Sequence, residues 1–348
     1  LESEGIRELL KQMKPDNIRD LIAVLALYRP GPLGGGMVDS YVNRKHGRET
    51  WQDAHPVMSD VLNETYGVMV YQEQIMRILN RLGGIELSKS YACIKAISKK
   101  IQEKIDAAKA DFLRGAQERG VSKDVADDIF AKIVFFAGYG FNKSHTAAYA
   151  QIGYQTAYLK THYTAEYMAA LLSSEIDDGN KRDVMVDHIA DARKLGVAVE
   201  PPDVNQGQPD FDVVGGKIVF GLTAIKGLGR AAAAEIVRAR QAGGRFKDLF
   251  DFCERVDLRV VKQMAIEKLI KAGAMDCLGK NRRAAMLLAL PRAAAGAEDK
   301  AADRKRGQKN IFDLYADDEA DATGPAKGFA AGEGLGDVPE WPELEKLK

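Results

Sequence analysis

The residues with the clearest chemical potential lie in the segment 136–149, where a loop interrupted by glycines leads into an expected helix. The loop delivers Asn142, Lys143, Ser144 and His145 to the first turn of that helix. Unpaired backbone N–H groups and the helix dipole attract anions at such a turn, and a cation with hydroxyl and imidazole donors strengthens the attraction. The pattern is typical of a site that binds the phosphates of a nucleotide.

Two aromatic residues flank the same turn. Tyr139 and Phe141 lie where a ring could stack on a nucleobase, because stacking needs only an accessible flat face. The alternative is a capped helix with a buried His145, since every helix start offers the same backbone groups. The residues alone leave both interpretations open.

A second glycine-rich turn lies in the segment 222–231, which holds Lys226, Gly227, Gly229 and Arg230. A short helix, a Gly-x-Gly turn and a longer helix are typical of a helix-hairpin-helix. Its glycines let backbone N–H groups approach a DNA phosphate, and its cations add charge. The segment 269–274 has the pattern of a paired hairpin. The alternative is a turn kept only for packing, because a turn glycine need only satisfy its backbone angles.

Helices must position the first of these sites. Pro30 and Pro32 are expected to end one helix, Gly34 to Gly36 to form a flexible joint, and Ser122 to cap another helix. Apolar residues recur at helical spacing over residues 6–13, 18–28, 71–82, 101–119, 122–136 and 144–158.

The composition changes at Pro201 and Pro202. Residues 211–214 and 217–220 are expected to pair as a β-hairpin, because the two glycines between them supply the positive φ angles of a tight turn. Short helices follow to about residue 290, and the stretch rich in Ala, Gly and acidic residues from Pro291 onward indicates a flexible linker. We therefore predict a mainly α fold with three domains, over residues 1–200, 201–290 and 291–348.

Charge is segregated along the chain. The net charge of the 348 residues is zero, but residues 311–348 contain ten acidic residues and three lysines. The preceding part is therefore net positive by seven. A basic body with an acidic tail suits a protein that binds a polyanion.

The cysteines and the apolar runs indicate the cellular compartment. Cys93, Cys253 and Cys277 fit neither a CxxC metal site nor a disulfide framework, and no apolar run reaches the length of a membrane span. We expect a reduced, cytoplasmic protein without membrane contact. The chain opens without Met and both ends look like cuts through helices, so we also expect it to be a piece of a longer protein.

Several motifs resemble, in order, the C-family bacterial replicative DNA polymerases, the family of the DNA polymerase III alpha subunits. The segment 136–149 is similar to the fingers signature of that family, and the resemblance runs from about residue 1 to residue 279. Further matching motifs are Leu27-Tyr28-Arg29-Pro30-Gly31-Pro32, Arg44-Lys45-His46-Gly47, Glu64-Thr65-Tyr66-Gly67 and Tyr71-Gln72-Glu73-Gln74-Ile75-Met76. The resemblance implies a fingers domain followed by a helix-hairpin-helix domain that binds DNA.

The resemblance also implies roles for individual residues. Tyr139 and His145 would contact the incoming dNTP, and Lys143 would contact its phosphates or nearby DNA. The expected nucleotide-binding residues near this turn are Arg29, Tyr139, Asn142, Lys143, Ser144 and His145. The expected DNA-binding residues are Lys226, Gly227, Gly229 and Arg230.

One basic segment departs from the family pattern. The family has two arginines at the place where this chain has Ile94 and Lys95, and Ile94 cannot bind a triphosphate. Lys95 offers a point charge rather than a bidentate fork. Lys95, Lys99 and Lys100 are still expected to neutralise nucleotide phosphate, and a solvated basic helix face is the alternative.

The resemblance implies nucleotidyl transfer with Mg²⁺ in the full-length enzyme, because polymerisation needs carboxylates that hold two ions. In the family these are aspartates of a palm domain that lies N-terminal to this sequence. We therefore expect no catalytic residue and no metal ligand in this chain, and no polymerisation by the chain alone. The adjacent pairs Asp127-Asp128, Asp177-Asp178 and Asp317-Asp318 are given no metal role.

The expected linker contains Gln308, Ile311 and Phe312, which resemble the Gln-x-x-aliphatic-Phe peptide that docks on the sliding clamp. Two apolar anchors in a polar segment can fill a pocket while the glutamine fixes the peptide backbone. The expected partners are dNTP, primer–template DNA, the sliding clamp and other subunits of the replicase holoenzyme. Two alternatives stay open: a non-catalytic module that binds DNA and the clamp, and a part of an error-prone paralogue.

Overall fold

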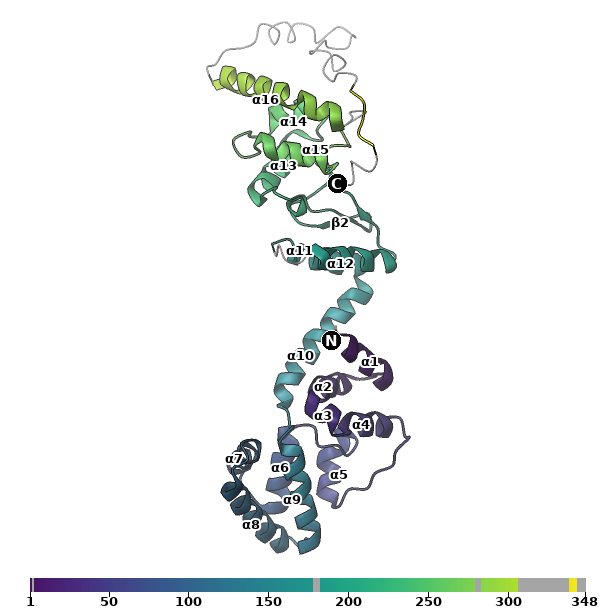
Figure 1. Cartoon of the computed structure of the whole chain (residues 1–348), viewed down its shortest axis with the longest axis vertical. Helices are drawn as coiled ribbons and strands as arrows, with labels where there is room; N and C mark the ends of the chain where they lie inside the picture. Colours follow the sequence, from purple (N-terminus) through teal and green to yellow (C-terminus); the bar gives the residue numbers. More distant parts are fainter. Residues whose placement is uncertain (2, 178–181, 279–282, 306–337, 343–348) are drawn as a thin grey trace. The chain divides into compact units, whose positions relative to one another are not determined.

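The structure is a computed structural model that describes residues 1, 3–177, 182–278, 283–305 and 338–342. Within these residues the chain is mainly helical with a small sheet, which confirms the predicted fold class. It forms two compact units, Leu1–Tyr158 and Leu159–Lys348, and the division lies within helix α10, Lys143–His162 (Figure 1).

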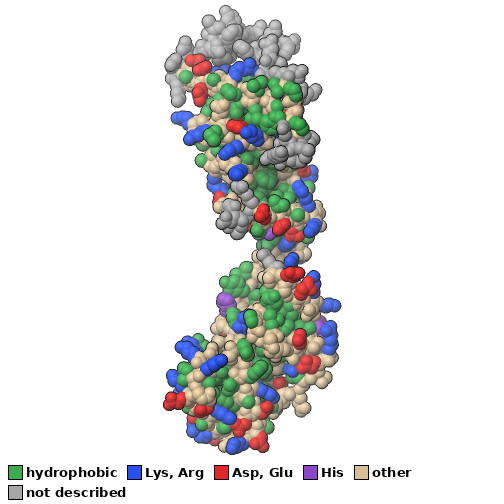
Figure 2. Space-filling view, viewed as in Figure 1, with side chains coloured by type: hydrophobic (Ala, Val, Ile, Leu, Met, Phe, Trp, Pro, Cys, Tyr) green, Lys and Arg blue, Asp and Glu red, His purple; other side chains and the backbone are tan. Residues whose placement is uncertain are grey.

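The first unit is built from nine α-helices and one 3₁₀ helix before α10 begins, within the residues described. Their bounds are α1 Glu4–Met13, α2 Ile18–Leu27, α3 Pro30–Gly34, α4 Met37–Lys45, α5 Pro56–Leu62, η1 Asn63–Thr65, α6 Gln72–Gly83, α7 Leu87–Ser98, α8 Gln102–Glu118 and α9 Lys123–Ala137. Helices α6 to α9 pack against one another (Figure 1). On the face of this unit seen in Figure 2, basic and acidic side chains are interspersed.

Two apolar clusters hold this unit together. The first joins α1, α2 and α4 to the extended segment 68–71, with Leu27 and Tyr41 fully buried. The second joins α5 to α9, with Ile75 and Phe112 fully buried. Helices with one apolar face are stabilised mainly by burying that face, so these two clusters hold the helices of the first unit together.

A buried ion pair lies inside the first cluster. The ammonium of Lys45 lies 2.7 Å from a carboxylate oxygen of Asp20, and the two side chains are only 5% and 2% exposed. The hydroxyl of Tyr41 donates a 3.2 Å hydrogen bond to the other oxygen of Asp20. A buried carboxylate is tolerated when its oxygens are paired in this way, so α2 and α4 are joined by a polar link within an apolar core.

The helix boundaries show one success and one correction. Ser122 caps α9, since its hydroxyl accepts a 3.5 Å hydrogen bond from the N–H of Val125, as expected. α2 ends at Leu27, before Pro30 and Pro32 as expected, but Pro30 begins a further helix, α3, that was not predicted and that includes Gly34 of the expected joint. Proline suits the first turn of a helix because the missing N–H would have no partner there.

The second unit contains a small sheet and six further α-helices among the residues described. Their bounds are α11 Thr164–Ser174, α12 Arg182–Lys194, β1 Val199–Glu200, β2 Asp212–Val214, β3 Lys217–Val219, η2 Leu222–Ala224, α13 Arg230–Gly243, α14 Leu249–Arg255, α15 Gln263–Lys271 and α16 Arg283–Lys305. None of the described helices combines the length and the apolarity needed to cross a membrane.

The sheet has the strand order β1-β3-β2. The predicted hairpin is confirmed: β2 and β3 are antiparallel, and Gly215 and Gly216 both have positive φ. The parallel strand β1 was not predicted, because two residues carry no detectable alternation. One apolar cluster joins α11 and α12 to this sheet, with Met168, Leu172 and Ile218 fully buried.

A further cluster joins α13 to α16, with Ile236, Leu249 and Leu269 fully buried. The linker expected from Pro291 is wrong in its first part, because α16 continues through Pro291 to Lys305. Ala293 and Ala297 are buried in the cluster, and α14 and α16 pack closely. This packing compensates for the hydrogen bond that a proline removes from a helix interior. The division into domains at residues 200 and 290 stays a prediction.

Candidate nucleotide and DNA interface

The loop before α10 is held by a short parallel bridge between Tyr71 and Phe141. The N–H of Phe141 donates to the carbonyl of Val70 at 3.1 Å, and the N–H of Gln72 donates to the carbonyl of Phe141 at 2.9 Å. The buried Gln74 fixes the other side of the bridge, since its side-chain oxygen accepts hydrogen bonds from the N–H groups of Val70 and Tyr71 at 2.9 and 3.0 Å. The start of α6 therefore positions the expected nucleotide-binding loop.

The first turn of α10 is occupied by groups of the protein itself. The N–H of Lys143 donates to both carboxylate oxygens of Glu73 at 3.0 Å. The side-chain oxygen of Asn142 accepts hydrogen bonds from the N–H of His145 at 2.9 Å and from the hydroxyl of Ser144 at 2.6 Å. The helix is thus capped, as one alternative expected, but His145 is exposed rather than buried. An incoming anion would have to exchange with Glu73 or bind beside it.

The Lys143 side chain is also engaged. Its ammonium lies 2.6 and 2.8 Å from the two carboxylate oxygens of Glu64, and 5.3 Å from the centre of the Tyr71 ring. The two charged side chains are 36% and 26% exposed, so water reaches the pair. Solvent screening makes such a pair exchangeable, because a partly exposed ion pair contributes little net free energy.

Arg29 links the start of α3 to the same loop. Its guanidinium donates to the carbonyls of Tyr139 and Ala26, both at 2.8 Å, and lies 4.3 Å from the centre of the Phe141 ring. Burial lowers the pKa of the Arg29 guanidinium below its usual value. Arg29 therefore lies at the loop, as expected, and its guanidinium holds the backbone of Tyr139.

The ring of Tyr139 lies directly against Gly31. A Cβ atom at Gly31 would lie 2.2 Å from the nearest ring carbon, which no real contact tolerates. Gly31 therefore lets the Tyr139 ring approach α3 closely, while 39% of the residue remains exposed. An exposed ring fixed in this way is a suitable surface for a base to stack on.

A row of rings continues along α10. The ring of His145 lies 5.5 Å from Phe141 and 4.8 Å from Tyr149, measured between ring centres. Tyr149 is 58% exposed. The row gives the start of α10 a partly apolar face beside its polar first turn, as a site for both the base and the phosphates of a nucleotide would need.

Of the expected phosphate-binding lysines, Lys95 lies on α7, and Lys99 and Lys100 lie in the turn that follows it. Their side chains make no hydrogen bond or ion pair with residues 139–145 in the part of the chain that the structure describes. Lys95 lies 4.6 Å from the centre of the Tyr91 ring, while Ile94 is 1% exposed and belongs to the apolar cluster of α5 to α9. The position of Ile94 therefore faces the interior, where an arginine could not reach a nucleotide without rearrangement.

The glycine-rich turn of the second unit has the geometry of a helix-hairpin-helix. Gly227 has a φ of +82° in the turn between η2 and α13, and Leu228 is buried in the apolar cluster. Lys226 and Gly229 are exposed. Arg230 forms two hydrogen bonds with the carboxylate of Asp210 at 2.8 and 2.9 Å, and this contact raises the pKa of the Arg230 guanidinium.

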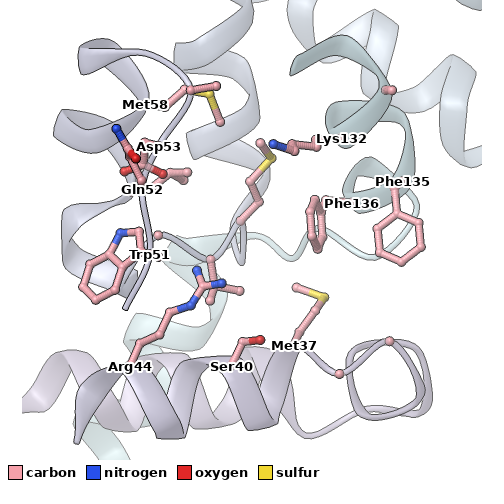
Figure 3. Close-up of a pocket in the computed structure, with 18 of the residues that line it drawn as sticks. Met37, Ser40, Arg44, Trp51, Gln52, Asp53, Met58, Lys132, Phe135 and Phe136 are labelled. Atoms are coloured by element: carbon pink, nitrogen blue, oxygen red, sulfur yellow. The ribbon is translucent and has the colours of Figure 1, made fainter. Parts of the chain in front are cut away.

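The sequence did not indicate a cavity of about 560 Å³ in the first unit (Figure 3). Its lining side chains come from α4, from the segment 50–58 and from α9, including Arg44, Trp51, Met58 and Phe136. Segments that are far apart in sequence build it, so no local pattern could have shown it. Phe135 lines the cavity and lies 6.1 Å from the Tyr139 ring, measured between ring centres.

No three Asp, Glu, His or Cys side chains come together as possible metal ligands among the residues that the structure describes. The sequence did not indicate that Glu64 and Glu73 are partners of Lys143. Their separation from it, 79 and 70 residues, explains why. The clamp-peptide prediction, on Gln308, Ile311 and Phe312, lies outside the described residues.

Fold and site together define a helix-rich protein with a helix-hairpin-helix and a glycine-flanked helix start. A family described as the bacterial DNA polymerase III alpha subunit finger domain matches residues 1–120, and one described as a helix-hairpin-helix motif matches residues 196–285. The turn at Gly227 lies within the second match. Residues 139–145 lie beyond the first.

Curated relatives cover the whole chain. The DNA polymerase III subunit alpha of Vibrio cholerae is 43% identical over 100% of this chain and 29% of that protein. The proteins of the same name from Pasteurella multocida and Thermus aquaticus are 42% and 43% identical, over 99% and 92% of this chain and 29% and 26% of those proteins. The chain thus spans less than a third of each of these relatives. It belongs to the bacterial DNA polymerase III alpha-subunit family and contains a finger domain followed by a helix-hairpin-helix.

Proposed function

We propose that this chain supplies the nucleotide-gripping and duplex-holding parts of a replicative DNA polymerase. The proposal is supported above all by the match to both families in the order that the polymerase subunits have. In the full-length enzyme the chain would bind the incoming dNTP and primer–template DNA for template-directed nucleotidyl transfer, in the cytoplasm and together with other replicase subunits.

The proposed nucleotide site is the start of α10 with Arg29 behind it. The Tyr139 and His145 rings would face the base or sugar, and Lys143, Asn142 and Ser144 would meet the phosphates once Glu64 and Glu73 release the first turn. Lys95 on α7, with Lys99 and Lys100 in the turn that follows, would add positive charge beside the path of the triphosphate or DNA. The proposed DNA site is the turn with Lys226, Gly227, Gly229 and Arg230.

Mg²⁺ would be bound by the aspartates of the palm domain that the resemblance implies; no group of three possible metal ligands occurs among the residues that the structure describes. We therefore expect no primer extension by the chain alone with Mg²⁺ and all four nucleotides. A full-length alpha subunit that carries this sequence should extend the same primer. Extension by the chain alone, lost with EDTA, would contradict the proposed division of labour, and no extension by the full-length subunit would contradict the polymerase assignment itself.

Tethering to the sliding clamp is a separate part of the proposal. The peptide of Gln308, Ile311 and Phe312 would dock its two apolar side chains in a pocket of the clamp. Replacing both Ile311 and Phe312 with Ala should abolish retention of the chain on immobilised clamp. Lys309→Ala is the matched control, and equal retention of all three proteins would end this part of the proposal.

A further inference from the structure

The turn at Gly227 is covered by a lysine from a helix outside the hairpin. A Cβ atom at Gly227 would lie 2.0 Å from the ammonium nitrogen of Lys268, and 3.1 and 3.2 Å from the two carbons that precede it. Lys268 belongs to α15, 41 positions further along the chain. Its ammonium therefore fills the space that any side chain at Gly227 would need.

Packing, rather than an ion pair, sets this position. Ile266, Leu269 and Ile270 on α15 are fully buried in the same apolar cluster as Leu228 of the turn. Lys268 itself is half-buried and forms no ion pair or side-chain hydrogen bond with the residues that the structure describes. Lys271 on the same helix pairs with Glu267, so the lack of a partner distinguishes Lys268 from its neighbour.

The surroundings of this ammonium suit an anion. Lys226 is exposed beside the turn and likewise has no ion-pair partner within the described ranges. Gly229 offers no side chain to cap the start of α13. A partly desolvated cation gains free energy when an opposite charge approaches, and turns of this kind let a backbone phosphate come close.

We propose that Lys268 is a further phosphate ligand of the DNA-binding turn, contributed by α15 across Gly227. Its ligand is the phosphodiester backbone of duplex DNA, contacted without regard to base sequence. This inference rests on the proposed DNA-binding function. It adds that Gly227 serves two purposes: it allows the positive φ of the turn and it admits the Lys268 ammonium.

The test measures the affinity of the chain for a short fluorescent duplex by anisotropy, as salt rises from about 50 to about 200 mM. Each phosphate contact made by a cation contributes about 0.9 to the slope of log affinity against log salt. Lys268→Ala should reduce the magnitude of that slope by about 0.9. Between the lowest and highest salt, the affinity of the unaltered chain should therefore drop by a factor about 3 times larger than the affinity of the Lys268→Ala variant. Lys268→Arg should keep the slope.

Lys217→Ala is the matched control, because it also removes one lysine from the second unit but one that pairs with Glu200 on the sheet. It should leave the slope unchanged. Thermal melting of each variant establishes that it folds, and Lys268→Gln replaces Lys268→Ala if the alanine variant does not.

The outcomes separate the two levels of the proposal. If the unaltered chain binds duplex with a salt-dependent affinity and Lys268→Ala keeps the full slope, the role of Lys268 is wrong and the DNA-binding function stands. If the unaltered chain shows no salt-dependent binding of duplex, the DNA-binding function fails and the role of Lys268 fails with it.

Discussion

The start of α10 and the turn at Gly227 both combine glycines with cations at a helix start, but their cations are paired differently. In each, glycines precede a helix whose first residue is a cation, Lys143 in α10 and Arg230 in α13. At α10, Glu73 accepts the first N–H and Glu64 pairs with Lys143. At the turn, Lys226 and Lys268 have no ion-pair partner within the described part of the chain.

The difference is caused by residues that are distant in sequence. Glu64 and Glu73 come from η1 and α6, and the bridge between Tyr71 and Phe141 brings them to α10. No carboxylate is brought in the same way to Lys226 or Lys268 among the residues described. A cation with an internal partner must exchange that partner for the ligand, whereas an unpaired cation binds the ligand directly.

The largest expected effect concerns the internal pairing within the first unit. Lys45→Met leaves the Asp20 carboxylate, 2% exposed, without its cation. Breaking a buried pair from one side destabilises a protein by about 3 kcal/mol or more. Urea denaturation should show that loss. Lys11→Met is the control, since Lys11 pairs with Glu8 on the surface, and its effect should stay below about 0.5 kcal/mol. Equal stability of the two variants would refute the structural role of the buried pair.

A smaller loss of stability is expected at the support of the nucleotide loop. Gln74→Leu removes the acceptor of the Val70 and Tyr71 N–H groups in a buried place. Leaving such donors unpaired costs about 2 kcal/mol. The same variant should loosen the loop, with faster hydrogen exchange at the N–H of Phe141. Unchanged exchange at Phe141 would show that the loop does not depend on Gln74.

The third prediction addresses the exchange of internal for external anions at α10. Glu64→Gln removes the carboxylate partner of Lys143. Because the pair is partly exposed, its loss should lower the stability of the protein by at most about 1 kcal/mol. The freed ammonium should tighten the binding of a dNTP about 3-fold to 5-fold, as measured by fluorescence titration with a labelled nucleotide. Glu49→Gln, at the Arg44 pair, is the control. Weaker binding by Glu64→Gln would mean that Glu64 positions Lys143 rather than competing for it.

The smallest expected effect is at the one paired cation of the DNA-binding turn. Asp210→Asn releases Arg230 from its carboxylate partner. The duplex affinity of the variant should rise a few-fold at low salt, and the slope of log affinity against log salt should steepen by up to about 0.9. Asp257→Asn, which changes the partner of Arg259, serves as the control. An unchanged slope would place Arg230 away from the DNA.

Local patterns predicted much of the fold. The hairpin of β2 and β3 and the cap at Ser122 depend on residues within a few positions of one another, so the sequence indicates them directly. Strand β1 and the continuation of α16 through Pro291 depend on packing against distant segments, on β3 and on α14. Tertiary contacts override local preferences in both cases.

The candidate site divides in the same way. The ring row of Phe141, His145 and Tyr149 follows from spacing along a loop and one helix. The carboxylates that neutralise Lys143, and the approach of Lys268 to Gly227, join segments 41 to 79 residues apart. Sequence motifs indicate which residues carry charge, but only the fold determines whether that charge is already paired.

We propose that the start of α10 binds the incoming nucleotide of a polymerase. This proposal is tested most directly by single-nucleotide incorporation with a full-length alpha subunit that carries this sequence, comparing Lys143→Met with Lys132→Met, a surface control that pairs with Asp128. Lys143→Met should raise the KM for the dNTP about 10-fold or more, because a charged contact worth about 1.4 kcal/mol is lost, and Lys132→Met should leave the KM unchanged. The same KM for both variants and for the unaltered enzyme would contradict the claim.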